Sequence, residues 1–385
     1  MALDLQAIRR EFPLLQDKTY LNNCSYGVLS HRVEAAFNEY LNSRKEWGAQ
    51  WEHWVERQES LRAVVGRLLD SPAEDVSLST SLSQSVNSLA SSLDWTGDRD
   101  TVVVTDFDFP TSSQIWLAQS RRQARVVRAR ADDSGVHIPL EHFDELIDDR
   151  TLIVSVPYVC YRNGVKTDIG PIIEMAHDRG ALVFVDAYQA VGSFPISAAD
   201  TGADFLAGGC LKYLLGTAGL AYMYVRGSLQ APQVPTMTGW FAQENPAAMD
   251  IYHNAPASTA RRFESGTPNV SALYACAAGI ELLLETGLEA VGEQVGHLTG
   301  LIAQGAAERG WKLVTPADPA RHGALMALAS TDAPALVRAM SEENIVVSDR
   351  DGNLRVSPHY YNNDDDIQRL FAALDRNANL LRPAD

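Results

Sequence analysis

Short apolar runs alternate with helical patterns between residues 101 and 226, and this alternation limits the chain to few folds. Six runs are expected to be strands: 101–107 (TVVVTDF), 124–131 (ARVVRARA), 150–159 (RTLIVSVPYV), 181–188 (ALVFVDAY), 203–209 (ADFLAGG) and 220–226 (LAYMYVR). Helical patterns separate several of them, as in 114–123 and 169–180. Near-continuous apolar strands separated by helices are typical of a mostly parallel sheet covered on both faces. The sequence therefore predicts an open α/β fold.

The last hundred residues predict a second, smaller α/β unit. Apolar runs (GWKLVTP, GALMALAS, NIVVSDR and LRVSPHY) lie between helical patterns, and a final helix begins at Asp364. A helix is also expected over residues 271–287, and the N-terminal stretch has the pattern of a short amphipathic helix. We expect a large domain over residues 20–270 and a small domain formed by residues 1–19 together with 271–385.

Two further segments of the large domain have contrasting sequence patterns. Residues 43–69 have the pattern of one long helix, with Trp47, Trp51 and Trp54 at a spacing that puts them on one packing face. Residues 227–260 are rich in Pro, Ala and Asn and lack periodicity, which predicts a long loop or several loops.

Composition narrows the classes of partner. A chain of 385 residues is long enough for two domains, and its formal net charge of -17 argues against nucleic acid or an anionic membrane surface. No apolar run approaches the roughly 20 residues of a membrane span, and no signal peptide is visible, so we expect a cytoplasmic protein. The four scattered cysteines, Cys24, Cys160, Cys210 and Cys276, do not suggest a zinc site or a disulfide framework.

The sequence has only five lysines, and one of them, Lys212, closely follows the predicted strand 203–209. Asp186 ends the preceding strand pattern, and ligands of such sheets bind beyond the carboxyl ends of the strands. A desolvated lysine favours its amine form, which can form a Schiff base, and a buried carboxylate can hold a protonated ring nitrogen. Pyridoxal phosphate requires these two groups. Taken singly, Asp186 could equally be a helix cap or a solvated acid, and Lys212 a surface lysine.

Several motifs, in this order along the chain, resemble the class V aminotransferase group of fold type I pyridoxal phosphate enzymes. They are YLNNCSYGVL (20–29), STSLSQSVN (79–87), DFPTSSQIW (108–116), VCYRNGVKTDI (159–169), VDAYQAVGSFPIS (185–197), GGCLKYLLGTAGLAYMYV (208–225), RFESGTP (262–268) and LRVSPHYYNN (354–363). The group includes cysteine desulfurases, selenocysteine lyases, kynureninases, isopenicillin N epimerase-like proteins and cysteine S-conjugate lyases. The resemblance covers nearly the whole chain and implies a large pyridoxal phosphate domain with a small C-terminal α/β domain.

The resemblance implies roles for the residues around the cofactor ring. Lys212 would form the Schiff base and move the proton at the substrate Cα. Asp186 would pair with the pyridinium nitrogen, Gln189 would donate to the ring hydroxyl, and Phe109 would stack on the ring.

The resemblance also implies contacts to the cofactor phosphate. Ser83 and Gln84 would bind it at a turn that enters a helix beginning near Val86. Gly266 and Thr267 would reach the phosphate of the other subunit, which implies a homodimer. Cys210 stands where the family often has the phosphate-binding serine, and a thiol is a poorer donor than a hydroxyl.

Further residues are implied for the substrate pocket. Arg355 would pair with the substrate carboxylate through its planar guanidinium. Cys24, Tyr26, Trp240 and His359 would lie near the pocket, although packing roles fit Cys24 and Trp240 as well.

The reaction is predicted from departures within the pattern. Leu211 replaces the histidine that desulfurases keep before the lysine, no cysteine follows Cys276, and Ser112 replaces an acidic residue of the kynureninase pattern. We therefore expect Cα deprotonation and β-elimination on an α-amino acid, most simply a cysteine S-conjugate, in natural-product biosynthesis. The alternatives are an aminotransferase, decarboxylation-coupled deamination or epimerisation, and a catalytically silent cofactor-binding protein. A nucleotide-binding fold is disfavoured because neither Gly-rich phosphate-loop motif is present.

Overall fold

All six expected strands belong to one sheet in the computed structural model, which describes residues 3–384. The seven strands follow the order β2 (Val76–Ser79), β8 (Ala221–Val225), β7 (Phe205–Gly209), β6 (Leu182–Asp186), β5 (Thr151–Pro157), β3 (Thr101–Thr105) and β4 (Arg125–Ala129). Strands β3 to β7 pair in parallel, and β8 runs antiparallel to both of its neighbours. The mostly parallel sheet confirms the predicted α/β class. The short edge strand β2 was not among the expected strands.

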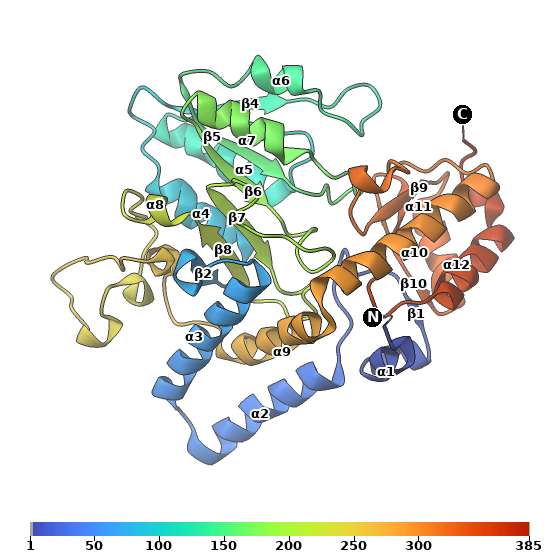
Figure 1. Cartoon of the computed structure of the whole chain (residues 1–385), viewed down its shortest axis with the longest axis horizontal. Helices are drawn as coiled ribbons and strands as arrows, with labels where there is room; N and C mark the ends of the chain where they lie inside the picture. The colour runs from blue at the N-terminus through green and yellow to red at the C-terminus, as the bar shows by residue number, and fades with distance from the viewer. Residues whose placement is uncertain (1–2, 385) are drawn as a thin grey trace.

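Helices cover both faces of this sheet (Figure 1). Helices α3 (Trp51–Leu68), α7 (Ile169–Asp178) and α9 (Val270–Thr286) share one apolar cluster with one face of the strands. Helices α4 (Leu82–Ser92) and α5 (Pro110–Ala118) share a second cluster with the opposite face. Successive residues of a strand point to opposite faces, so the side chains of β6 divide between the two clusters.

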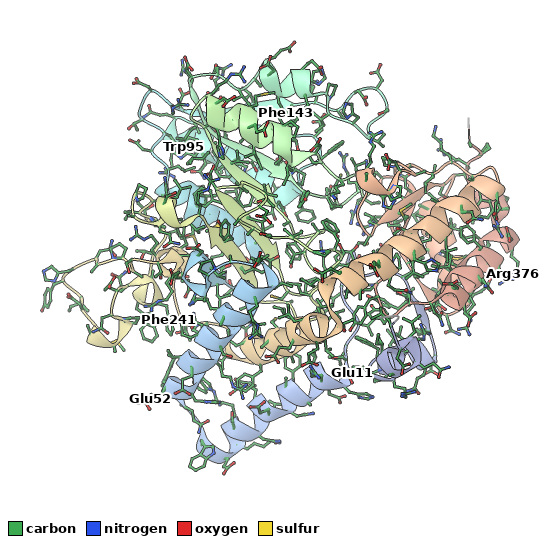
Figure 2. All side chains as sticks on the ribbon, viewed as in Figure 1. Glu11, Glu52, Trp95, Phe143, Phe241 and Arg376 are labelled. Atoms are coloured by element: carbon green, nitrogen blue, oxygen red, sulfur yellow. The ribbon has the colours of Figure 1, made fainter. Side chains whose placement is uncertain are left out.

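Side chains fill the space between the layers (Figure 2). Phe143 and Trp95 are both almost completely buried, in the first and second clusters respectively. Trp95 meets Trp116 of α5 edge to face, with ring centroids 6.3 Å apart. The large aromatic side chains thus pack the sheet firmly against its helices.

A smaller unit lies beside the sheet (Figure 1). Its antiparallel sheet has the order β11 (Ser348–Arg350), β12 (Asn353–Val356), β9 (Met326–Ala329). The N-terminal strand β1 (Thr19–Tyr20) pairs in parallel with β10 (Ile345–Val346). The run 310–316, expected to be a strand, makes only isolated bridges.

The N-terminal helix α1 (Leu5–Arg10) lies against this smaller unit, as the sequence suggests. The Arg9 guanidinium pairs with the buried Asp366 carboxylate at 2.6 Å and donates to the Tyr361 carbonyl at 3.0 Å. Leu21 packs in the same apolar cluster as α10 (Leu288–Glu308), α11 (Ala333–Glu342) and α12 (Asp364–Arg376). The two ends of the chain therefore build one unit together.

Helices α9 and α10 lie on opposite sides of Gly287, and α10 contributes to both cores. Leu283 of α9 and Val291 and Val295 of α10 pack in the large cluster, whereas Leu298 of α10 packs in the small one. The two helices meet at an angle of 84°, and Gly287 has φ +88°, which favours glycine. Because the change of core falls between Val295 and Leu298, we propose that the domain boundary lies within α10 rather than at residue 270.

The helix expected over residues 43–69 is wrong as a single element. It is divided into α2 (His31–Trp47) and α3 by a break at Gly48, which has φ +71°. The break also separates the three tryptophans. Trp54 is buried, but Trp47 is 63 % exposed and Trp51 is 47 % exposed, so they do not form one packing face.

The remaining elements are short. They are α6 (Leu140–Asp144), α8 (Gly227–Gln230) and the 3-10 turns η1 (Pro13–Gln16), η2 (Ala73–Asp75), η3 (Gln119–Arg122), η4 (Trp240–Ala242), η5 (Pro246–Ala248), η6 (Ala260–Phe263), η7 (Pro319–Arg321) and η8 (Ala378–Leu380). Within residues 3–384 no single helix has the length and apolar composition to cross a membrane; by these two measures alone, only the bent pair α9 and α10 would qualify together.

A buried ion pair ties α3 to the segment that follows η6. The Arg62 guanidinium lies 2.5 Å from a Glu264 oxygen, and both side chains are almost fully buried. The same carboxylate accepts hydrogen bonds from the Leu78 N–H at 2.9 Å and from the Gln58 amide at 2.8 Å. Glu264 thus holds α3, β2 and the start of the 265–268 turn in one arrangement.

Replacing Glu264 with alanine should lower the free energy of unfolding by about 3–5 kcal/mol, because the Arg62 charge would stay buried without its main partner. Urea unfolding of the purified variant measures this. The matched control is Glu59→Ala, which removes the half-exposed partner of the same guanidinium and should cost less than about 1 kcal/mol. Equal losses for the two variants would contradict the structural assignment.

Candidate active site

Asp186 and Lys212 line one cavity beyond the carboxyl ends of the parallel strands. The cavity has a volume of about 280 Å³. Its lining residues come from six chain segments, and they are Ser25, Ser81, Leu82, Ser83, Phe107, Phe109, Thr111, Pro157, Val159, Tyr161, Asp186, Tyr188, Gln189, Leu211 and Lys212. Five of the residues expected at the cofactor, Lys212, Asp186, Gln189, Ser83 and Phe109, are therefore brought together.

Lys212 stands in the loop that follows β7. Burial lowers the pKa of its amine to about 8, while the Cys24 thiol and the Asp186 carboxyl oppose the shift and Arg355 adds to it. The loop is held from outside its own strand, because the Gly27 N–H donates to the Leu211 carbonyl at 2.8 Å. A Cβ at Gly27 would lie 2.4 Å from the Lys212 carbonyl oxygen, so this close approach requires glycine.

Asp186 is the last residue of β6 and is only 7 % exposed. One carboxyl oxygen accepts the Tyr188 N–H at 3.0 Å, and the other lies 3.5 Å from the Ser112 hydroxyl. Burial raises the pKa of this carboxyl, and the Tyr188 N–H and the Lys212 amine oppose that rise. A positive charge placed in the cavity would therefore be strongly attracted to it.

The first turn of α4 forms another wall. The helix begins at Leu82, with the Ser81 hydroxyl capping the Gln84 N–H at 3.2 Å, so it starts four residues before the position expected from the sequence. N–H groups at the start of a helix lack partners within the helix, and they attract anions. Ser83 lines the cavity, whereas Gln84 does not.

Gln189, which follows β6, and Phe109, which precedes α5, both line the cavity. The Gln189 side chain is buried, its amide nitrogen donates to the Cys24 carbonyl at 3.1 Å, and its amide oxygen has no partner among residues 3–384. Phe109 is 40 % exposed and meets the Tyr161 ring edge to face at 4.9 Å. An unpaired buried amide oxygen beside an accessible aromatic face suits a ligand with a ring and a hydroxyl group.

Arg355 lies on β12 of the smaller unit and contacts residues of the cavity wall on the side away from the cavity. Its guanidinium donates to the Tyr161 carbonyl at 2.9 Å, the Ser348 hydroxyl at 3.0 Å and the Ser25 hydroxyl at 3.3 Å. The residue is 5 % exposed, and its Nε is buried without a partner in the described chain. Arg355 does not itself line the cavity, but Ser25 and Tyr161 do.

Cys24 and Tyr26 flank Ser25 without lining the cavity. The Cys24 thiol is buried, 3.9 Å from the Ser348 hydroxyl and 4.0 Å from that of Ser25. Tyr26 is 40 % exposed, and its phenol oxygen accepts the Ala218 N–H at 2.9 Å.

Four other predicted residues lie apart from the cavity. Gln84, Gly266 and Thr267 line a separate small cavity of about 30 Å³, where the Gln84 amide bonds the Ser265 hydroxyl. Trp240 packs edge to face on Trp51, 5.9 Å between centroids.

Cys210 and His359 are also packed away from the cavity. A hydrogen bond with Cys276, together with burial, raises the pKa of the Cys210 thiol well above its usual value. The fully buried His359 imidazole accepts the Tyr360 N–H at 2.8 Å and donates to the Tyr213 carbonyl at 2.8 Å. Its other contacts are with aromatic rings. His359 therefore supports the residue that follows Lys212.

Sequence reasoning did not assign roles to several cavity residues, notably Tyr161, Tyr188 and Thr111, nor to Ser348 behind the wall. Tyr188 could have been found, because it lies between Asp186 and Gln189 in the DAYQ motif. Ser348 lies opposite Arg355 in the β11–β12 pairing, and that register cannot be read from the sequence.

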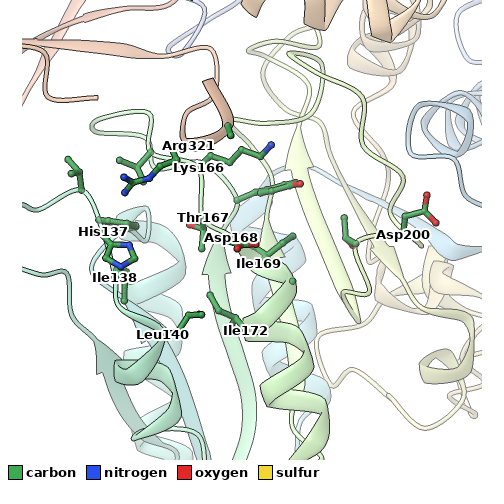
Figure 3. Close-up of a pocket in the computed structure, with 17 residues that line it drawn as sticks. His137, Ile138, Leu140, Lys166, Thr167, Asp168, Ile169, Ile172, Asp200 and Arg321 are labelled. Atoms are coloured by element: carbon green, nitrogen blue, oxygen red, sulfur yellow. The ribbon is translucent and has the colours of Figure 1, made fainter. Parts of the chain in front are cut away.

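A larger cavity, about 810 Å³, lies elsewhere, between α7, the loop near residue 137 and η7. Figure 3 shows His137, Lys166 and Arg321 on one side of it and Asp200 on the other. Phe107 lines both cavities. None of the residues predicted to bind cofactor or substrate lines the larger one, so volume alone does not locate the chemistry.

The residues of the smaller cavity fit pyridoxal phosphate. A buried carboxyl suits a protonated ring nitrogen, a buried amine with a lowered pKa suits an aldehyde, and the start of α4 suits a phosphate. The unpartnered Gln189 oxygen adds a place for a hydroxyl group. The sheet and this donor set define the class: a fold type I, pyridoxal phosphate-dependent enzyme.

Comparisons with known proteins agree. The model of the family "Aminotransferase class-V" matches residues 28–370. The chain is 34 % identical to the "uncharacterized aminotransferase YcbU" of Bacillus subtilis, covering 94 % of this chain and 95 % of that protein. It is 26 % identical to a kynureninase of Geobacillus thermodenitrificans, covering 92 % and 86 %. The protein belongs to the class V aminotransferase family.

Solved structures show the same fold. The apo cysteine desulfurase of Thermococcus onnurineus superimposes with a TM-score of 0.87 at 21 % identity, covering 98 % of this chain and 99 % of that chain. The cystine C–S lyase C-DES, in complex with its product cysteine persulfide, superimposes with a TM-score of 0.85 at 19 % identity, covering 94 % and 98 %.

The buried His359 makes a prediction about acid stability. Burial lowers the pKa of its imidazole to about 4, whereas an unfolded histidine titrates near 6.5. Between these values the unfolded chain binds a proton that the folded chain does not, so acidification from pH 6.5 towards 4 should remove about 3 kcal/mol of stability. The free energy of unfolding of wild type and His359→Gln should therefore converge as the pH falls.

Urea unfolding at several pH values between 7 and 4.5 measures this convergence. The control is His297→Gln, which changes a half-exposed histidine paired with Asp364 at 2.7 Å. Its curve should run close to that of the wild type, and parallel curves for His359→Gln would refute the assignment.

Proposed function

We propose that this enzyme is a carbon–sulfur lyase acting on a cysteine S-conjugate. The reaction removes the Cα proton, breaks the bond between Cβ and sulfur, and, with one water, yields a thiol, ammonia and a keto acid. We also propose a role for each of the main residues of the site, on the basis of its position.

One observation carries the proposal: the cavity offers a single amine and no second base of similar strength. Besides Lys212 and Asp186, its lining residues supply hydroxyl groups, the Gln189 amide and apolar groups. A thiol has a pKa near 8.5, so sulfur can leave as the anion without a proton donor. Hydrolytic cleavage of a carbon–carbon bond would require an activated water, for which this lining supplies no dedicated base.

Arg355 is the proposed partner of the substrate carboxylate. A guanidinium can form a bidentate pair with a carboxylate, and its unpaired Nε leaves donor capacity. The Ser25 and Ser348 hydroxyls fix its orientation. Because the guanidinium lies behind Ser25 and Tyr161, the substrate would have to displace at least one of these contacts.

Lys212 is the proposed base at Cα. Its pKa of about 8 leaves a usable fraction of free amine near neutral pH. Asp186 would hold the positive charge of the cofactor ring nitrogen, and the start of α4 would hold the phosphate. The cofactor, when bound, withdraws electrons from Cα and so makes its proton removable.

The placement of the cysteines favours release of the sulfur over its transfer to the protein. All four are free and buried, and no cysteine follows Cys276 in the sequence. A thiol that accepts sulfur must be accessible as a thiolate. C-DES, named as a cystine C–S lyase, indicates by fold alone that such a frame accommodates the reaction.

The proposal includes a homodimer in the cytoplasm, in a biosynthetic pathway. Gly266 and Thr267 line a small cavity separate from the one holding Lys212, as expected if they serve the phosphate of a second subunit. The exposed Trp47 and Trp51 provide apolar area that an interface could cover.

An aminotransferase is the second candidate, favoured by the 34 % identity to a protein named as one. It would use the same base and the same carboxylate partner. The difference lies in where the Cα proton is delivered and whether the amino group stays on the cofactor.

A product assay separates these reactions. We expect cysteine S-conjugates to release thiol and ammonia over many turnovers, measured by a thiol reagent and an ammonia assay, with the cofactor spectrum restored at the end. One keto acid per site and a lasting change of the cofactor spectrum would indicate an aminotransferase instead. A change in the configuration of the amino acid would indicate epimerisation, carbon dioxide would indicate decarboxylation, and no spectral response to any amino acid would indicate a silent protein.

Lys212→Ala tests the attachment of the cofactor. Borohydride reduction followed by peptide mass spectrometry should find the cofactor on the Lys212 peptide of the wild type and on no peptide of the variant. Lys166→Ala is the matched control, since Lys166 lies on the larger cavity and should leave the labelling unchanged. Cofactor still covalently bound to Lys212→Ala would sink the proposed function.

A further inference from the structure

The Tyr188 side chain lies between the end of β7 and the Lys212 amine. The backbone N–H of Tyr188 donates a hydrogen bond to the Asp186 carboxylate at 3.0 Å. Its ring lines the smaller cavity, and no hydrogen bond of its hydroxyl is found within residues 3–384. Burial raises the pKa of this phenol above its usual value, with the Cys210 thiol, Asp186, Cys276 and Tyr26 adding to the rise.

Gly209 makes room for this ring. A Cβ at residue 209 would lie 2.2 Å from both Cζ and the hydroxyl oxygen of Tyr188. Gly209 is a regular strand residue outside the left-handed region of φ, so glycine is needed here for space and not for backbone conformation. Any larger residue at this position would push the tyrosine ring into the cavity.

The ring in turn faces the amine. Lys212 Nζ lies 4.5 Å from the centroid of the Tyr188 ring and 5.8 Å from that of Phe109. No hydrogen bond to this amine is present in the described chain. The charged or titratable groups that influence it are Cys24, Asp186 and Arg355. The nearer aromatic face is thus a principal direct contact of the Lys212 amine.

We propose that Tyr188 is a positioning residue, whose ring face holds the Lys212 nitrogen at the cavity and stabilises its cationic form. Attraction between a cation and an aromatic face strengthens as the two are withdrawn from water, and both side chains here are partly buried. The nitrogen would return to the same place whenever substrate frees it, ready to move the Cα proton. This inference rests on the role of Lys212 in the proposed function.

Two substitutions separate this role from simple filling of space. Tyr188→Phe keeps the aromatic face and removes the hydroxyl, whereas Tyr188→Leu fills much of the same volume without an aromatic face. Tyr222→Leu is the matched control. Tyr222 packs on the adjacent glycine, Gly208, whose Cβ would lie 2.4 Å from the Tyr222 hydroxyl, and it belongs to the apolar cluster on the opposite face of the sheet.

The measurement is a pH titration of the visible absorption of the holoenzyme, which reports protonation of the nitrogen that joins Lys212 to the cofactor. We expect Tyr188→Leu to move the midpoint down by about one pH unit, because the cation loses its aromatic partner. Tyr188→Phe and Tyr222→Leu should titrate like the wild type. Circular dichroism and thermal melting test whether each variant is folded. If Tyr188→Leu does not fold, Tyr188→Met, which also lacks an aromatic ring, is measured instead.

The proposal is overturned if Tyr188→Leu titrates like the wild type, or if Tyr188→Phe shifts as far as Tyr188→Leu. A second measurement does not depend on the cofactor. The full chain, freed of cofactor, is reductively methylated with ¹³C-formaldehyde, and the methylated lysines are observed by NMR. With only five lysines, the Lys212 resonance is assigned by its loss in Lys212→Ala. If peptide mapping places the cofactor elsewhere, the proposed function fails, while the pH titration of this resonance in the same variants still decides the role of Tyr188.

Discussion

A carboxyl and an amine, both withdrawn from water at the ends of neighbouring parallel strands, determine the rest of the site. Asp186 closes β6, and Lys212 follows β7 within a few residues. Burial acts on the two groups in opposite senses, raising the pKa of the acid and lowering that of the amine, so each becomes easier to neutralise. Each group partly offsets the pKa shift of the other, which makes the cavity receptive to a ligand that carries both a protonated ring nitrogen and an electrophilic carbon.

The position of this pair depends on contacts from parts of the chain that are distant in sequence. Gly27 holds the carbonyl of the residue before Lys212, and His359 holds the carbonyl of the residue after it. Arg355 reaches the cavity wall from the smaller unit through hydrogen bonds to Ser25 and Tyr161. The large sheet therefore supplies the reactive groups. The N-terminal and C-terminal segments of the chain supply the hydrogen bonds that hold these groups in place.

Sequence reasoning found the elements whose signal is local. Six of the seven strands of the large sheet were identified because each is a compact apolar run, and Asp186 and Lys212 because each lies at or just after the end of such a run. The break at Gly48 was missed, since glycine is tolerated within helices and its positive φ becomes evident only in the structure. The start of α4 was placed too late, because a Ser-rich turn hides its cap at Ser81.

Side-chain direction explains the remaining differences at the site. Gln84 is adjacent to Ser83 in sequence, yet on a helix neighbouring side chains diverge, and Gln84 points to the Ser265 side. Cys210 and His359 lie near Lys212 along the chain or in space, but they point into packed surroundings. Such directions depend on which glycines and carbonyls meet across the fold, and those contacts are not encoded in any local motif.

The hydrogen bonds from Gly27 and His359 to the residues on either side of Lys212 have a consequence for the synthesis of the protein. The ribosome makes the Lys212 loop long before it makes His359, so the loop lacks one of its two supports until translation has passed residue 359. Before that point only the Gly27 N–H can hold the loop. The loop that carries Lys212 is thus held on both sides only after both structural units have been synthesised.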